Sequence, residues 1–377
     1  MLDFLRDFSV SWLDGAVRSA DSFRRSLASL YPVHEDPPPT TPFEVLYEGG
    51  RLRLRYYRPV GKPLSPPLLI VYALIKRPFI LDLQPGVSVI DNFIRQGIPV
   101  YLTDWLPPTP ADAWRGFDAY VNGDLSTAVQ TVQDHANVNQ VSLLGYCFGG
   151  LLSTIYTALH PHTVKHLITL SIPLDWSKQD IPFFNLTKNL DPRLVTDVFG
   201  NCPAWIVKAA FSSLAPVHHA FDKYVGLYRN KERAGYAEMF ERFERWMNSD
   251  VPLAGQIFRE LHHDLITHNL LVQGRMQVGG RQVNLQHIKC PLLNIVGKHD
   301  DVVLPHASLV LTDLVGSRTK DTIRFPAGHI GVVVSSGAQK TLWPQVGAWL
   351  KRRDRRRSGL RQPALAPVDT RDEATLH

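Results

Sequence analysis

Cysteine is scarce in this chain, which has only Cys147, Cys202 and Cys290 among its 377 residues. An odd number of widely spaced cysteines argues against a disulfide framework. Proteins that keep their cysteines reduced are typical of reducing compartments. We therefore expect a cytoplasmic protein.

Long apolar runs are also missing. The longest, at about 68–75, is far shorter than the ~20 residues that a membrane-spanning helix needs. The first twenty residues mix acidic side chains among their apolar ones, which is not typical of a secretory signal peptide. We expect no transmembrane segment.

The usual cofactor motifs are absent as well. The sequence has no P-loop, no GxGxxG after its first strand, no HExxH and no CxxC, so we expect no metal or nucleotide cofactor. The net charge is +6, but 351–377 alone holds eight basic and four acidic residues. The body of the chain is therefore nearly neutral, and we expect no nucleic-acid surface on it.

Short apolar runs alternate with helical patterns along most of the chain. This alternation predicts an α/β fold with a mostly parallel sheet and helices on both faces. Expected strands lie at 52–58 (an edge strand), 68–74, 98–104, 141–146, 166–172, 291–296 and 321–325. Expected helices cover 87–97, 125–137, 150–160 and 336–353.

One long region breaks the alternation. Between about 172 and 288 we find no convincing strand, only helical patterns rich in bulky residues, which indicate a helical cap inserted between two strands. We expect an N-terminal helical segment with a Pro-rich linker at 1–44 and a catalytic domain at 45–353. The basic tail at 354–377 is poor in large apolar residues, which predicts disorder.

The strongest chemical signal is the sequence LLGYCFGG at 143–150. Its G-x-C-x-G follows a predicted strand and precedes a predicted helix, which is the nucleophile-elbow pattern of the α/β-hydrolase fold with cysteine as the nucleophile. Gly145 and Gly149 are needed because side chains there would collide with the neighbouring strand and helix. The helix N-terminus favours a thiolate at Cys147, and the Phe148 N–H can stabilise an oxyanion.

A cysteine nucleophile needs a base and an acid, which follow it in this fold in the order nucleophile, acid, histidine. His329 lies in a glycine-containing loop between the last predicted strand and the last helix. Asp300 and Asp301 follow the predicted strand 291–296, and loop position favours Asp300. The fold takes its second oxyanion donor from the loop after the strand 68–74, which indicates the amide of Ile75 or Leu74.

Other histidines are weaker candidates for the base. They lie near the end of the predicted helix 150–160 or in the cap pattern: His160, His162, His166, His262 and His263.

Several segments in register resemble the polyhydroxyalkanoate synthase family. They are the block 70–105 with its DLQP at 82–85, the modified lipase box at 144–150, the aspartate loop at 297–305 and the histidine loop at 327–335. The likeness covers about 45–350 and implies a triad of Cys147, Asp300 and His329. In the family the acid is commonly followed by His and then Pro, as D-H-x-V-P. Here the run is DDVVLP, so aligning Pro305 instead would make Asp301 the acid.

The resemblance implies an acyltransferase that polymerises (R)-3-hydroxyacyl-CoA into a polyester through a Cys-linked acyl-enzyme and releases CoA. It also implies a granule-associated homodimer that works with a second, smaller synthase subunit. Two alternatives stay open: an α/β-fold thioesterase or other hydrolase with a cysteine nucleophile, and a non-catalytic granule-associated paralogue.

Overall fold

The structure is a computed structural model that describes residues 36–63, 66–181, 188, 190–214 and 236–355. The predicted N-terminal helical segment and all but the start of the basic tail lie outside these residues.

Eight strands form one sheet in the order β1-β2-β6-β3-β7-β8-β11-β12. The pairs β1/β2 and β2/β6 are antiparallel, and the other five pairs are parallel. This confirms the predicted α/β class with a mostly parallel sheet. The strands are β1 Glu44–Gly49, β2 Leu52–Tyr57, β3 Leu68–Val71, β6 Val100–Trp105, β7 Val141–Tyr146, β8 Val164–Leu170, β11 Leu292–Gly297 and β12 Lys320–Phe325.

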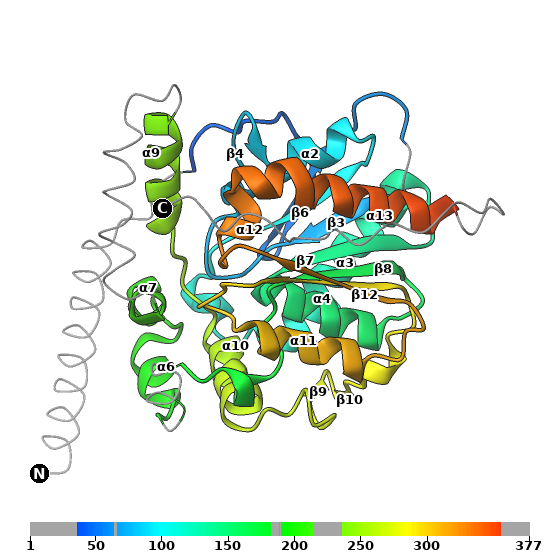
Figure 1. Ribbon diagram of the computed structural model, residues 1–377. Helices are drawn as coiled ribbons and strands as arrows, with labels where there is room; N and C mark the ends of the chain where they lie inside the picture. The colour runs from blue at the N-terminus through cyan, green and yellow to red at the C-terminus, as the bar shows by residue number, and fades with distance from the viewer. Residues whose placement is uncertain (1–35, 64–65, 182–187, 189, 215–235, 356–377) are drawn as a thin grey trace, which may run out of the picture.

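Helices cover both faces of the sheet, which explains why its central strands read as continuous apolar runs. Figure 1 shows α2 (Val89–Arg95) and α13 (Trp343–Arg355) on one face, and α4 (Phe148–Leu159) and α11 (Pro305–Leu314) on the other. The remaining short helical elements of this part are η1 Pro78–Leu81, η2 Pro110–Asp112, η3 Ala119–Leu125, α3 Ser126–Ala136, η4 Trp176–Lys178, η6 Leu285–His287, α12 Gly331–Val334 and η7 Ala338–Leu342.

The prediction that 52–58 is an edge strand is wrong. β2 lies between β1 and β6, and β1 forms the edge of the sheet. β1 escaped sequence reasoning because its EVLYEG side chains are exposed or half-buried and show no apolar alternation.

The expectation that 172–288 contains no strand is also wrong at one point. β9 (Gln277–Val278) and β10 (Arg281–Gln282) form a short antiparallel hairpin. Gly279 and Gly280 connect them with φ of 57° and 70°, and a glycine pair is the residue choice that such a tight turn favours.

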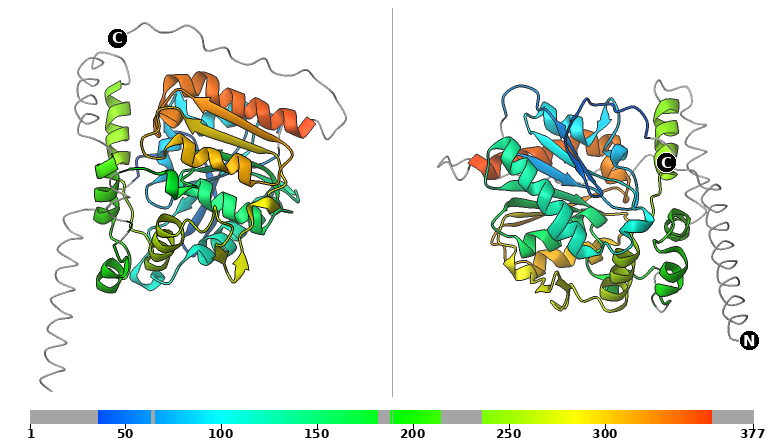
Figure 2. Two further views of the ribbon diagram at one scale, coloured as in Figure 1. Left: turned by 60° about the horizontal axis from the view of Figure 1, so that its bottom comes forward. Right: turned by 180° about the vertical axis from the view of Figure 1, so that it is seen from behind.

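The other regular elements described in the insertion are helices, joined by loops. Figures 1 and 2 show α6 (Arg193–Phe199), α7 (Ala204–Leu214) and α9 (Tyr236–Met247) along one side of the sheet. Helix α10 (Gly255–Glu260) continues into the π-helical turn η5 (Leu261–Thr267) and returns the chain toward the sheet. Within the described part of the chain, no helix combines the length and apolar character needed to cross a bilayer.

A second small hairpin precedes α2. Strands β4 (Asp82–Gln84) and β5 (Val87–Ser88) pair antiparallel around Gly86. The helix expected from residue 87 therefore begins two residues later, with the Ser88 side chain accepting a hydrogen bond from the Asp91 N–H at 2.8 Å. This is an ordinary N-cap, which sequence periodicity alone did not locate.

Candidate active site

Cys147 lies at a sharp turn between β7 and α4. Its φ of 54° and ψ of −123° are strained for a residue with a side chain, and its N–H donates to the Leu170 carbonyl at 2.9 Å. The turn therefore holds the thiol at the N-terminus of α4, as the nucleophile-elbow pattern predicts.

The two glycines of the motif are required by their surroundings. A Cβ on Gly145 would lie 2.4 Å from the Gly150 Cα in the first turn of α4. A Cβ on Gly149 would lie 2.0 Å from the Val71 carbonyl oxygen at the end of β3. The strand and the helix thus approach so closely that only glycine fits at either position.

The structure brings His329 and Asp300 together, although 29 residues separate them. The Nδ1 atom of His329 lies 2.8 Å from Asp300 Oδ2, and both side chains are buried. Asp300 Oδ1 accepts from the N–H groups of Val302 and Val303 at 3.1 and 2.8 Å. These turn contacts orient the carboxylate so that its second oxygen faces the imidazole. Asp301, the alternative acid, is exposed.

The neighbours of His329 set its charge. Burial by itself lowers the pKa of this imidazole, but the charge of the Asp300 carboxylate opposes burial, and the neighbouring Cys147 and the hydrogen bond from Asp300 act in the same direction. The pKa of His329 therefore ends well above 6.5. A histidine that lies between a cysteine and a carboxylate has the geometry that could activate a cysteine nucleophile.

Sequence reasoning missed two aromatic residues beside this group. The ring of Tyr146 stacks on the His329 ring with centroids 5.2 Å apart, and its hydroxyl donates to the His329 carbonyl at 3.0 Å. Tyr72 follows β3, and its ring centroid lies 6.0 Å from that of Tyr146. The sequence signal for Tyr146 is its position directly before Cys147 in the elbow motif.

Cys147 is buried and only 8% exposed. The Trp246 indole N–H, at the end of α9, donates to both the Tyr72 hydroxyl and the Arg77 carbonyl at 3.0 Å. Tyr72 lies beside Tyr146, the residue that precedes Cys147. Through Trp246 the cap therefore contacts a residue next to the site.

The two predicted oxyanion donors come from different elements. Phe148 is the first residue of α4, so its N–H has no partner within the helix. Ile75 is buried in the loop after β3, where its carbonyl accepts from the Val251 N–H of the cap at 3.2 Å. The same loop contains Leu74, the alternative donor.

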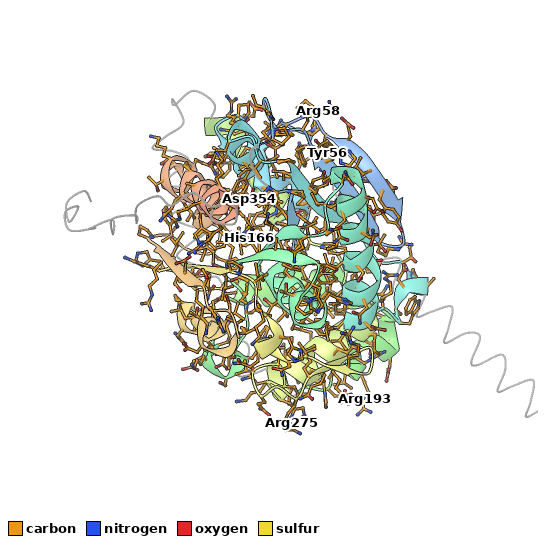
Figure 3. The ribbon with its side chains drawn as sticks, turned by 90° about the vertical axis from the view of Figure 1, so that its right-hand side faces the viewer. Tyr56, Arg58, His166, Arg193, Arg275 and Asp354 are labelled. Carbon is orange, nitrogen blue, oxygen red and sulfur yellow. The ribbon has the colours of Figure 1, made fainter. Side chains whose placement is uncertain are left out.

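The weaker histidine candidates have other partners. His160 Nε2 lies 2.7 Å from Asn122 Oδ1, and His263 Nδ1 lies 2.7 Å from Asp264 in the cap. His166 lies on β8 (labelled in Figure 3), where its Nδ1 is 2.9 Å from Ser142 Oγ and its ring lies beside that of Trp349 on α13. Neither His162 nor His262 has a described contact with Cys147.

Comparisons with known proteins agree with this fold. Residues 66–335 match the model of the alpha/beta hydrolase fold family. Among solved structures, that of MenH from S. aureus has a TM-score of 0.51 at 16% identity, over 80% of this chain and 98% of that chain. At this identity the likeness concerns the fold alone.

Relatives with closer sequences carry one name, poly(3-hydroxyalkanoate) polymerase subunit PhaC. The proteins from Allochromatium vinosum and Thiocystis violacea are 37% and 36% identical, over 83% of this chain and 89% of each relative. The Haloferax mediterranei protein is 37% identical over 83% of this chain, but the match spans only 64% of that longer protein. The chain therefore belongs to the α/β-hydrolase fold family and, within it, to the poly(3-hydroxyalkanoate) polymerase family of acyltransferases.

Proposed function

We propose that this chain polymerises (R)-3-hydroxyacyl-CoA into a polyester and releases CoA, with the growing chain held on Cys147 as a thioester. The observation that carries the proposal is the contact of His329 with Asp300, at 2.8 Å, beside a cysteine on a strained elbow. The names of the relatives supply the substrate class.

In the first half-reaction the Cys147 thiolate attacks the thioester carbonyl, and its proton is held by His329. A new C–S bond forms while the carbonyl oxygen becomes an oxyanion, which the N–H groups of Phe148 and Ile75 stabilise. The bond to the CoA sulfur then breaks, and His329 returns its proton to that sulfur. The products are free CoA and an acyl-enzyme.

In the second half-reaction His329 removes the proton from the 3-hydroxyl group of an incoming acyl unit or of the end of the growing chain. The alkoxide attacks the Cys147 thioester, an ester bond forms, and the C–S bond to Cys147 breaks. Asp300 stabilises the imidazolium at each transfer. The two thioesters, to CoA and to cysteine, are close in energy, so the acyl unit stays activated for transfer.

The buried site suits polymerisation better than hydrolysis. Cys147 is only 8% exposed, and water excluded from an acyl-enzyme cannot end the chain as a free acid. On this basis we favour a synthase over a thioesterase.

We also propose domain bounds, partners and a location for the protein. The catalytic unit would be 45–353 with its cap at 172–288, preceded by the 1–44 segment and followed by the 354–377 tail. The reaction as written needs no cofactor. A homodimer, a second synthase subunit and association with cytoplasmic polyester granules complete the proposal.

Mass spectrometry after brief exposure to 3-hydroxybutyryl-CoA tests this function. For the wild type we expect acyl mass on the Cys147 peptide, CoA release and polymer, whereas Cys147→Ala should show none of the three. Release of free 3-hydroxy acid without polymer would identify a hydrolase instead. Neither label nor CoA release, even with longer acyl chains, would favour the non-catalytic paralogue.

A further inference from the structure

The cap is joined to the loop after β3 by backbone pairing. Lys76 and Asp250 form an isolated antiparallel bridge, and the Val251 N–H donates to the Ile75 carbonyl at 3.2 Å. The paired residues are about 175 positions apart in sequence, so this contact exists only while the cap rests on the sheet domain.

A buried ion pair lies at the same contact between the cap and the loop. Lys76 Nζ donates to Asp250 Oδ1 and to the Met247 carbonyl, both at 2.8 Å, and the two charged side chains are 9% and 4% exposed. Burial lowers the pKa of Lys76, and the Asp250 carboxylate opposes that shift. Asp250 Oδ2 is buried and has no hydrogen-bond partner among the described residues. Charges buried in this way are costly and are poor stabilisers compared with apolar side chains.

Trp246 contacts both ends of the loop. Its indole N–H reaches the Tyr72 hydroxyl at one end and the Arg77 carbonyl at the other. The Lys76 ammonium lies 5.3 Å from the centre of the same indole. The loop from Tyr72 to Arg77 is therefore held along its length by one cap segment, 246–251.

This loop borders the nucleophile. It begins where β3 ends, and the Val71 and Tyr72 carbonyls are the atoms that a Cβ on Gly149 would strike, two residues after Cys147. Its Ile75 N–H is the proposed second oxyanion donor. The orientation of that N–H depends on backbone angles between Tyr72 and Lys76, which the cap segment restrains.

We propose that Lys76 and Asp250 are positioning residues that couple closure of the cap to assembly of the oxyanion hole. This inference rests on the proposed function. With the pair formed, the loop holds the Ile75 N–H toward the reacting carbonyl. When the cap lifts to admit substrate or extend product, the pair breaks and the loop relaxes. Acyl transfer is then fast only in the closed, dry state.

Two reactions of Cys147 separate this role from a general structural one. Acylation by 3-hydroxybutyryl-CoA passes through an oxyanion and needs both donors. Alkylation by iodoacetamide displaces iodide at a saturated carbon and forms no oxyanion. Because burial raises the pKa of both Cys202 and Cys290 to about 12, the Cys147 peptide is followed by itself, and Cys147→Ala gives the background from the other two thiols.

We expect Lys76→Met and Asp250→Asn each to slow single-turnover CoA release about tenfold or more, since loss of one oxyanion donor costs about 10²–10³ in rate. Alkylation should keep its rate or become faster as the cap loosens. The matched control is Glu241→Gln, which removes a carboxylate from exposed positions of the same cap helix, where it pairs with Arg245. It should leave both rates unchanged.

The double variant Lys76→Met/Asp250→Leu distinguishes a loss of positioning from a loss of stability. It removes both buried charges, so its thermal midpoint should match or exceed that of the wild type, while its acylation should stay slow.

Recovery of acylation along with stability would overturn the inference, as would equal slowing of acylation and alkylation in the single variants. A wild type that releases no CoA would overturn the proposed function and this inference together. Variants that match an active wild type overturn only the inference.

Discussion

Asp300 and Asp301 are adjacent in the chain but differ in their surroundings. Asp300 is 3% exposed and is held by two backbone N–H groups and by His329, while Asp301 is exposed. The aspartate turn thus directs only the first carboxylate toward the imidazole. This difference is geometric, so aligning the motif on Pro305 could not reveal it.

Asp300→Asn should lower CoA release about 10²–10⁴-fold, because the amide cannot stabilise the imidazolium. Asp301→Asn, the matched control, should change the rate about twofold at most. CoA release measured under identical conditions would compare the two. An equal loss from both variants would contradict the assignment of Asp300.

Stability should depend on pH through the same pair. The folded pKa of His329 lies above its unfolded value near 6.5, so the contribution of the pair is full below 6.5 and is lost as pH rises through the raised pKa. The thermal midpoint of Asp300→Asn should therefore fall furthest below that of the wild type at about pH 6, and the gap should narrow in alkaline buffer. A gap independent of pH would count against this interpretation.

Among the elements, α4 and β3 approach each other so closely that a glycine is needed between them. The Cβ of an alanine at Gly149 would meet two backbone oxygens, of Val71 and Tyr72, at 2.0 and 2.6 Å. Neither oxygen can withdraw easily, because β3 is hydrogen-bonded to β6 on one side and β7 on the other. The spacing between strand and helix is therefore set by the glycine.

Gly149→Ala should destabilise the fold by about 3 kcal/mol or more, since overpacking of a rigid contact costs that order of free energy. Gly123→Ala is the control, because a Cβ there meets no atom within 4 Å and its φ is not positive. Its stability should be unchanged or raised by up to about 1 kcal/mol. Urea unfolding would measure both, and a tolerated Gly149→Ala would contradict the packing argument.

Across the whole molecule, a buried charge network joins segments far apart in sequence. Asp104 on β6 is fully buried and contacts Arg55 on β2 and Arg77 in the loop before η1, the latter at 3.0 Å. Arg77 also binds Asp36 at 2.8 Å. The network thus connects the Pro-rich linker, two strands and the loop that touches the cap.

Asp104→Asn should destabilise the protein by about 3–5 kcal/mol, because it removes the fully buried counter-ion of two buried arginines and leaves only the more exposed Asp36 beside them. Glu44→Gln, which breaks the exposed pair with Arg58, is the control and should leave the thermal midpoint nearly unchanged. Calorimetry would compare the two. A small effect at Asp104 would show that Asp36 suffices to hold the arginines.

Much of this protein follows from its sequence alone. The α/β class and the positions of the parallel strands along the chain depend on local apolar periodicity, which neighbouring residues encode. The position of the elbow turn, with Gly145 and Gly149 around Cys147, can be predicted because strand, turn and helix are consecutive in the chain. The motifs together also predicted the family that the relatives confirm.

Tertiary structure decided what depends on distant contacts. The exposed β1 became a strand by pairing with β2, and the partner of His329 was selected by how the aspartate turn folds. The contacts of Trp246 and Asp250 with the Tyr72–Arg77 loop join residues that lie about 170 positions apart. Local patterns carry no information on such pairs, because their free energy arises only when the folded chain buries both partners together.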